Sequence, residues 1–108
     1  ASRIKTYIGG GTQWQSVKTS NYTATAGQGV FMNTTSGALT LTLPASPSIG
    51  DEVTFVDYAG TFDSNNLTIA RNSSKIHGAE EDLTVAVERA ANTLVFTDST
   101  QGWLLKSK

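Results

Sequence analysis

Hydrophobic and polar residues alternate along most of the chain, in short runs that end at glycine, proline, asparagine or aspartate. The clearest run is "LTLTL", residues 39–43, which Pro44 ends. Successive side chains of a β-strand point to opposite faces, so this run predicts a strand with a leucine face and a threonine face. Proline ends the strand because it has no N–H to donate to a neighbouring strand.

The same alternation recurs on both sides of this run. The segments that we expect to form strands are 12–18, 22–26, 29–35, 38–43, 52–58, 67–71, 75–78, 83–87, 92–98 and 103–106. Roughly eight to ten short strands separated by turn residues are typical of an all-β fold. We therefore expect a compact antiparallel sandwich or a jelly-roll-like barrel. The acidic segment 78–83 could start a single helical turn.

The first residues do not show this alternation. Residues 1–11 end in three glycines, so we interpret them as a flexible N-terminal arm that becomes ordered against a partner. The arm residues that we expect to bind the capsid or another partner are Arg3, Ile4, Lys5, Tyr7 and Ile8. Residues 12–108 are enough for one compact β domain. The opening Ala1 fits removal of an initiator methionine, so we interpret the N-terminus as intact.

Composition narrows the classes of protein to consider. Charged residues make up only 16% of the chain, below the usual share of about 25%. The chain has no cysteine, which excludes a disulfide scaffold, a thiolate zinc site and a cysteine nucleophile. No apolar run is long enough to span a membrane or to form a signal-peptide core, so we expect no membrane partner.

Charge is distributed unevenly along the chain. All nine acidic residues lie in 51–108, whereas residues 1–50 contain basic residues and no acid. The basic residues are too sparse for a nucleic-acid-binding surface, so no nucleic-acid partner is expected. A mildly basic arm before an acidic body suggests contact with another protein or with a second copy of the chain. A chance result of sparse charge is the alternative.

Reactive constellations are weak. His77 is the only histidine, and no Gly-x-Ser-x-Gly turn accompanies it, so we predict no catalytic residue and no enzyme. The acidic cluster at Glu80, Glu81 and Asp82 lacks the alternating loop pattern of a calcium site, so we predict no metal. No glycine-rich phosphate loop is present, so no cofactor is expected.

Aromatic side chains could stack on the apolar faces of sugars. For Trp14 and Trp103 we favour core packing, given their positions at the starts of strands. Tyr58 and Phe62 flank the turn-rich loop "YAGTFDSNN" and are the better candidates for an exposed ligand contact.

Several phrases together resemble a known β-domain. They are the Thr-Ala-x-x-Gly opening, "LTLPASPSIGDEV", "NNLTIARN", "KIHGAEEDL" and "TLVFTDSTQGW", within residues 21–105. The domain recurs in virion structural proteins of tailed bacteriophages, including tail-fibre, baseplate-associated and small decoration-type proteins, especially of phages that infect marine and cyanobacterial hosts. The chain departs from the pattern at residues 72–74, where "NSS" stands in place of Asn-Gly.

The resemblance implies a non-enzymatic virion protein that is assembled in the host cytoplasm as a homotrimer. The domain makes up nearly the whole chain and follows a basic arm, which favours a capsid decoration, or cement, protein whose arm binds the major capsid protein or another virion protein. The alternative is a tail- or head-fibre domain that binds a host-surface glycan through Tyr58 and Phe62.

Overall fold

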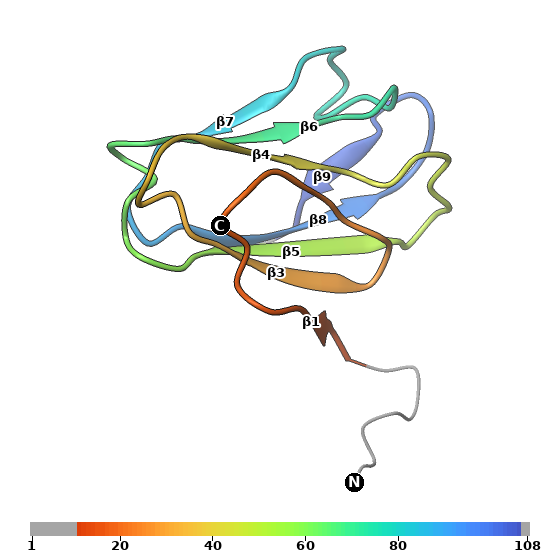
Figure 1. Cartoon of the computed structure of the whole chain (residues 1–108). Coiled ribbons are helices and arrows are strands. Elements are labelled where there is room, and N and C mark those ends of the chain that lie inside the picture. Colours follow the sequence, from red (N-terminus) through yellow and green to blue (C-terminus); the bar gives the residue numbers. More distant parts are fainter. Residues whose placement is uncertain (1–10, 107–108) are drawn as a thin grey trace, which may run out of the picture.

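The computed structural model describes residues 11–106, which form two β-sheets packed face to face (Figure 1). Sheet A contains, in order, β1 (Gln13–Trp14), β3 (Gln28–Met32), β5 (Glu52–Asp57), β8 (Ala91–Phe96) and β9 (Trp103–Leu105). Sheet B contains, in order, β2 (Tyr22–Thr23), β4 (Leu39–Thr42), β6 (Leu67–Ala70) and β7 (Leu83–Val85). The prediction of an all-β fold is confirmed, and of the two expected architectures, sandwich and barrel, the chain forms the sandwich.

The first six strands alternate between the sheets. Each crossing returns the chain in the same direction, so β1, β3 and β5 are parallel in sheet A, and β2, β4 and β6 are parallel in sheet B. The last three strands pair antiparallel: β7 with β6, β8 with β5, and β9 with β8. The expected antiparallel or jelly-roll pairing was therefore wrong for the first six strands. Alternation of side chains reports the pleat of one strand and carries no information on the direction of its neighbour.

The core lies between the sheets and is built from alternate residues of the strands. Its fully buried members include Val30, Met32, Leu41, Val53, Phe55, Leu67, Ile69, Leu94 and Trp103. Leu41 and Leu43 are both buried, as the "LTLTL" run predicts, and Leu39 packs against the same core. Each large apolar side chain stabilises the fold by about 1.5–3 kcal/mol when it is fully buried.

The first two strands are much shorter than the sequence pattern predicted. The expected strands at 12–18 and 22–26 shrink to the two-residue strands β1 and β2. The expected helical turn at 78–83 does not form: residues 78–81 are turns and bends around the bridge residue Ala79, and Leu83 begins β7. No helix occurs between residues 11 and 106, and so this part of the chain offers no helix that could cross a membrane.

Candidate functional site

The outward side of sheet A carries several apolar side chains that are partly or half exposed. Its side chains alternate with the core residues of β3, β5, β8 and β9. We name this surface outer face A, and its members are Trp14, Phe31, Thr54, Val56, Thr93, Val95 and Leu104. Strand pairing places Phe31 beside Val56, and Val95 beside Leu104. Val56 pairs with Ala91 on β8, and Val95 pairs with Glu52 on β5, so the apolar side chains form two separate pairs.

Trp14 is the largest side chain of outer face A. Its indole stacks on Phe31 with ring centroids 4.7 Å apart. It also lies over Gly29, where a Cβ atom would come within 2.5 Å of the indole Cε3 atom. About half of the side chain (49%) stays exposed. The expected core position was therefore wrong for Trp14 and correct for Trp103, which is fully buried.

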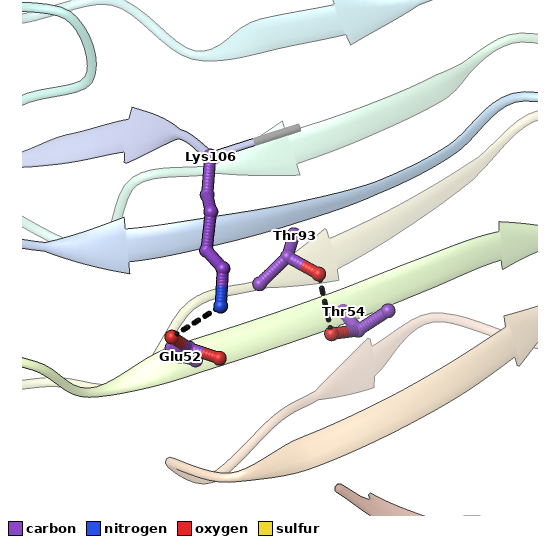
Figure 2. Close-up of polar contacts among 4 residues, drawn as sticks. All are labelled: Glu52, Thr54, Thr93 and Lys106. Carbon is purple, nitrogen blue, oxygen red and sulfur yellow. Dashed lines mark hydrogen bonds and ion pairs between the residues drawn. The ribbon is translucent and has the colours of Figure 1, made fainter. Parts of the chain in front are cut away.

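Polar contacts join β5 to β8 and to Lys106, which follows β9, at one margin of this face (Figure 2). Thr54 and Thr93 lie directly opposite each other on β5 and β8, and their hydroxyl oxygens are 2.8 Å apart. Lys106 Nζ donates to Glu52 Oε2 at 2.9 Å, with both side chains substantially exposed. All four side chains project from the same side of the sheet in Figure 2, so this margin of outer face A is polar and ordered.

A shallow depression of about 460 Å³ adjoins this polar margin. Thr12, Gln28, Asp51, Glu52 and Thr54 line it, together with Ala26. Gly11, Gly27 and Gly50 complete the lining and leave main-chain atoms accessible because they carry no side chain. The depression can therefore offer carboxylate, amide, hydroxyl and backbone groups to a small polar ligand.

The outward side of sheet B is covered by threonines in register. Thr40, Thr68 and Thr84 form one row across β4, β6 and β7, and Thr23 lies beside Thr42 in a second row. We name these five residues the threonine face. Adjacent members of a row stand on strands about 4.8 Å apart. The strands of sheet B contain no charged residue, so the threonine face presents hydroxyl and methyl groups alone.

Asp57 determines how the neighbouring loop turns. Its buried carboxylate accepts backbone N–H bonds from Gly60, Thr61, Phe62 and Arg89. Burial raises the pKa of this carboxyl, but the four hydrogen bonds outweigh it and hold the pKa below its ordinary value. Asp57 thus stays ionised and ties the loop after β5 to the turn before β8.

The two aromatic candidates of that loop, Tyr58 and Phe62, differ in exposure. Tyr58 is half exposed, as expected of a ligand contact. Phe62 is fully buried, so the expectation that it is exposed was wrong. The loop turns inward because Asp57 binds the N–H of Phe62, which directs the phenyl ring into the core. Arg89 donates to the carbonyl oxygen of Tyr58 at 2.9 Å and braces the exposed side of the loop.

The ionisable residues weighed for chemistry lie on the surface. His77 is exposed at a turn, and its backbone N–H donates to the carbonyl oxygen of Trp103. Glu80, Glu81 and Asp82 are exposed, and Asp82 accepts the N–H of Arg71. Between residues 11 and 106, no three histidine or acidic side chains are grouped as a metal site would require.

The proposed arm contacts Arg3, Ile4, Lys5, Tyr7 and Ile8 lie outside the described residues. Sequence reasoning also missed two features that the structure shows. The threonine rows were signalled by the similar phrases "ALTLTLP", "NLTIARN" and "DLTVAVE", which lie side by side as β4, β6 and β7. The exposed position of Trp14 was signalled by its polar neighbours Gln13 and Gln15.

The sequence matches no known family model and no curated protein. The resemblance to virion β-domains therefore rests on the phrases within the chain.

Proposed function

We propose that this chain is a non-enzymatic structural protein of a tailed-phage virion, and specifically a capsid decoration protein that assembles through the faces of its sandwich. The threonine face carries the proposal. It places five threonines in register and no charge on one side of a sheet. The resemblance of residues 21–105 to virion β-domains supports the same role.

The chemistry of the threonine face favours packing against another protein. A threonine side chain is short and has few rotamers, so ordering it at an interface costs less entropy than ordering lysine or glutamate. Its methyl group packs and its hydroxyl both donates and accepts, which allows an identical face to be a partner. Sheets of parallel strands usually have both faces covered by other parts of a protein. Within the described residues, the parallel strands β2, β4 and β6 have only their inner face covered, which leaves the threonine face for a partner.

In this proposal the protein forms a homo-oligomer, a trimer as the resemblance implies, on the outside of the shell. The basic arm, residues 1–11, binds the major capsid protein or another virion protein. The most direct test is the copy number per virion, measured by quantitative mass spectrometry of purified particles against the major capsid protein. Tens to hundreds of copies per head support decoration, because only the capsid lattice offers so many equivalent sites. Absence from the particle contradicts the proposal.

The role of the threonine face is tested by Thr68→Lys, which places a charge in the middle of the row between Thr40 and Thr84. We expect this variant to lose self-association or capsid binding in sedimentation experiments while its circular dichroism stays unchanged. Thr100→Lys is the matched control, because Thr100 is exposed in a turn outside both sheets. If both variants assemble normally, the threonine face is not the interface.

A fibre domain that binds a host-surface glycan is the second candidate. The half-exposed side chain of Tyr58 favours it. A copy number of only a few trimers per particle would support this function over decoration. Glycan binding that Tyr58→Ala abolishes would place the contact in the loop after β5. Phe62 has no part in this alternative, because its side chain is buried.

A further inference from the structure

The indole of Trp14 borders the depression at the margin of outer face A. A Cβ atom added to Gly29 would lie 2.5 Å from Trp14 Cε3 and 2.6 Å from Thr12 Cγ2, so these two side chains meet above Gly29. Thr12 is in turn one of the residues that line the depression. An aromatic ring and a polar concave surface are therefore neighbours on the same side of sheet A.

The ring is held in position although much of it is exposed. Phe31 stacks against it at an interplanar angle of 23°, and Gly29 allows it to approach the backbone of β3. Hydrogen bonds from Gln13 N to Gly27 O and from Gln15 N to Gly29 O fix the backbone on either side of Trp14. Because the ring is already held in position, stacking of a ligand on it costs little side-chain entropy.

The polar side chains of the depression are likewise held before any ligand binds. Their hydrogen bonds are Tyr22 Oη to Gln28 Oε1 (2.9 Å), Ser48 N to Asp51 Oδ2 (2.8 Å), Lys106 Nζ to Glu52 Oε2 (2.9 Å) and Thr54 Oγ1 with Thr93 Oγ1 (2.8 Å). Each bond leaves further donor or acceptor capacity on the group, since a carboxylate has two oxygens and an amide has two N–H donors. The depression is thus a prearranged set of hydrogen-bonding groups.

We propose that the depression and Trp14 together bind a neutral pyranose sugar with equatorial hydroxyl groups, such as a glucose or N-acetylglucosamine unit. Such a ring has an apolar C–H face, which stacks on the indole, and a rim of hydroxyl groups, which bind Asp51 and Glu52. The volume of about 460 Å³ lies within the usual range of small-ligand sites, about 300–1,000 Å³.

The lining argues against two other occupants. Asp51 and Glu52 carry negative charge, so an acidic sugar would be repelled. A protein partner would be expected to cover a more apolar surface, because the cores of protein interfaces are depleted of charged residues. The site lies on the side of the sandwich opposite to the threonine face, so it is independent of the proposed assembly surface.

The binding test uses the full chain and follows the indole N–H signals of its two tryptophans by NMR. The probes are cellotriose and chitotriose, which are neutral, and trigalacturonic acid, which is acidic. We expect the neutral probes to shift the Trp14 signal saturably. Trp103 is fully buried and serves as the internal reference, whose signal should stay in place.

Variants locate the contact. Trp14→Ala should weaken binding of the neutral probe by about tenfold or more, the loss of one stacking contact, as measured on the backbone amide signals of Gln28 and Glu52. Gly29→Ala keeps the indole but displaces it, because the new Cβ atom would occupy its place. It should weaken binding as well. Tyr58→Ala removes the other exposed aromatic ring within residues 11–106 and should leave the affinity within about twofold.

Several results would overturn the proposal. These are no saturable shift with either neutral probe, tighter binding of trigalacturonic acid than of the neutral sugars, or unchanged affinity in Trp14→Ala. A shift of the Trp14 signal that depends on protein concentration alone would overturn it too, because a second copy of the chain would then cover the ring.

Discussion

The indole of Trp14 lies where the side chain of any residue larger than glycine at position 29 would stand: a Cβ atom on Gly29 would be 2.5 Å from its Cε3 atom. The two residues pair directly across β1 and β3. The absence of a side chain at position 29 is therefore what allows an exposed tryptophan to lie flat on the outside of the sandwich.

The first prediction follows from this contact. Gly29→Ala should displace the indole, redden the tryptophan fluorescence and destabilise the fold by about 1 kcal/mol, the contribution of an aromatic stack such as Trp14 on Phe31. Gly11→Ala is the control, because a Cβ atom there meets nothing within 4 Å. An unchanged fluorescence maximum in Gly29→Ala would contradict the arrangement.

The second prediction concerns Gly102, whose Cβ atom would lie 1.9 Å from the carbonyl oxygen of Lys75. That oxygen accepts the N–H of Trp103 and cannot move away without breaking the bond. Gly102→Ala should destabilise the protein by more than about 3 kcal/mol in urea unfolding. Gly27→Ala is a matched control with a similar positive φ but open space around it, and it should cost only about 1–2 kcal/mol.

The third prediction is acid sensitivity centred on Asp57. Its pKa is lower in the folded state than its ordinary value of 3.8, so the folded state favours the ionised carboxylate. The resulting stabilisation is fully present above the ordinary pKa and is lost as the pH falls through the folded pKa. The free energy of unfolding should therefore decrease between pH 5 and pH 3, about one unit on either side of the ordinary pKa.

Asp57→Asn separates this effect from general acid destabilisation. It replaces one accepting oxygen with an amide that faces backbone N–H donors, so we expect a loss of about 2–4 kcal/mol at neutral pH. The decrease in stability between pH 5 and pH 3 should be smaller in this variant than in the wild type. Asp98→Asn alters an exposed turn carboxylate and should retain the wild-type pH dependence. Equal pH dependence of Asp57→Asn and the wild type would refute the assignment.

The fourth prediction concerns the hydroxyl pair Thr54 and Thr93. A double-mutant cycle with Thr54→Val and Thr93→Val should give a coupling energy of about 0.5 kcal/mol, as expected for a cross-strand pair. The value is small because both residues are partly exposed, and water can replace the lost partner. Coupling indistinguishable from zero in urea unfolding would show that the hydroxyl contact does not stabilise the sheet.

Local patterns in the sequence predicted the faces of individual strands well. Leu41 and Leu43 are buried, and Thr40 and Thr42 point outward, because a strand's pleat separates alternate residues whatever its partner is. The same rule could not distinguish an inner from an outer aromatic residue at a strand with few apolar neighbours. Trp14 and Trp103 both begin or end short strands, yet one is half exposed and the other fully buried.

The candidate sites depended still more on long-range contacts. Tyr58 and Phe62 are four residues apart in one loop, and only the inward turn imposed by Asp57 separates their environments. The depression combines residues from β3, from β5 and from the segment before β1, which are distant in the chain. No spacing in the sequence indicates that Thr12 and Glu52 line the same surface.

The amino-acid sequence by itself determined that the fold is all-β, with strands that have a leucine-rich face and a threonine-rich face, because side-chain alternation and turn residues act over a few residues. Only the tertiary structure decided that the first six strands cross between sheets and pair in parallel, that the threonines of β4, β6 and β7 align into rows, and that Trp14 stands outside the core. These features depend on which strands become neighbours and on where a glycine faces a ring. Both are set by the packing of the whole domain. Strands far apart in the chain can become neighbours in it, because the entropic cost of closing a loop grows only slowly with the length of the loop.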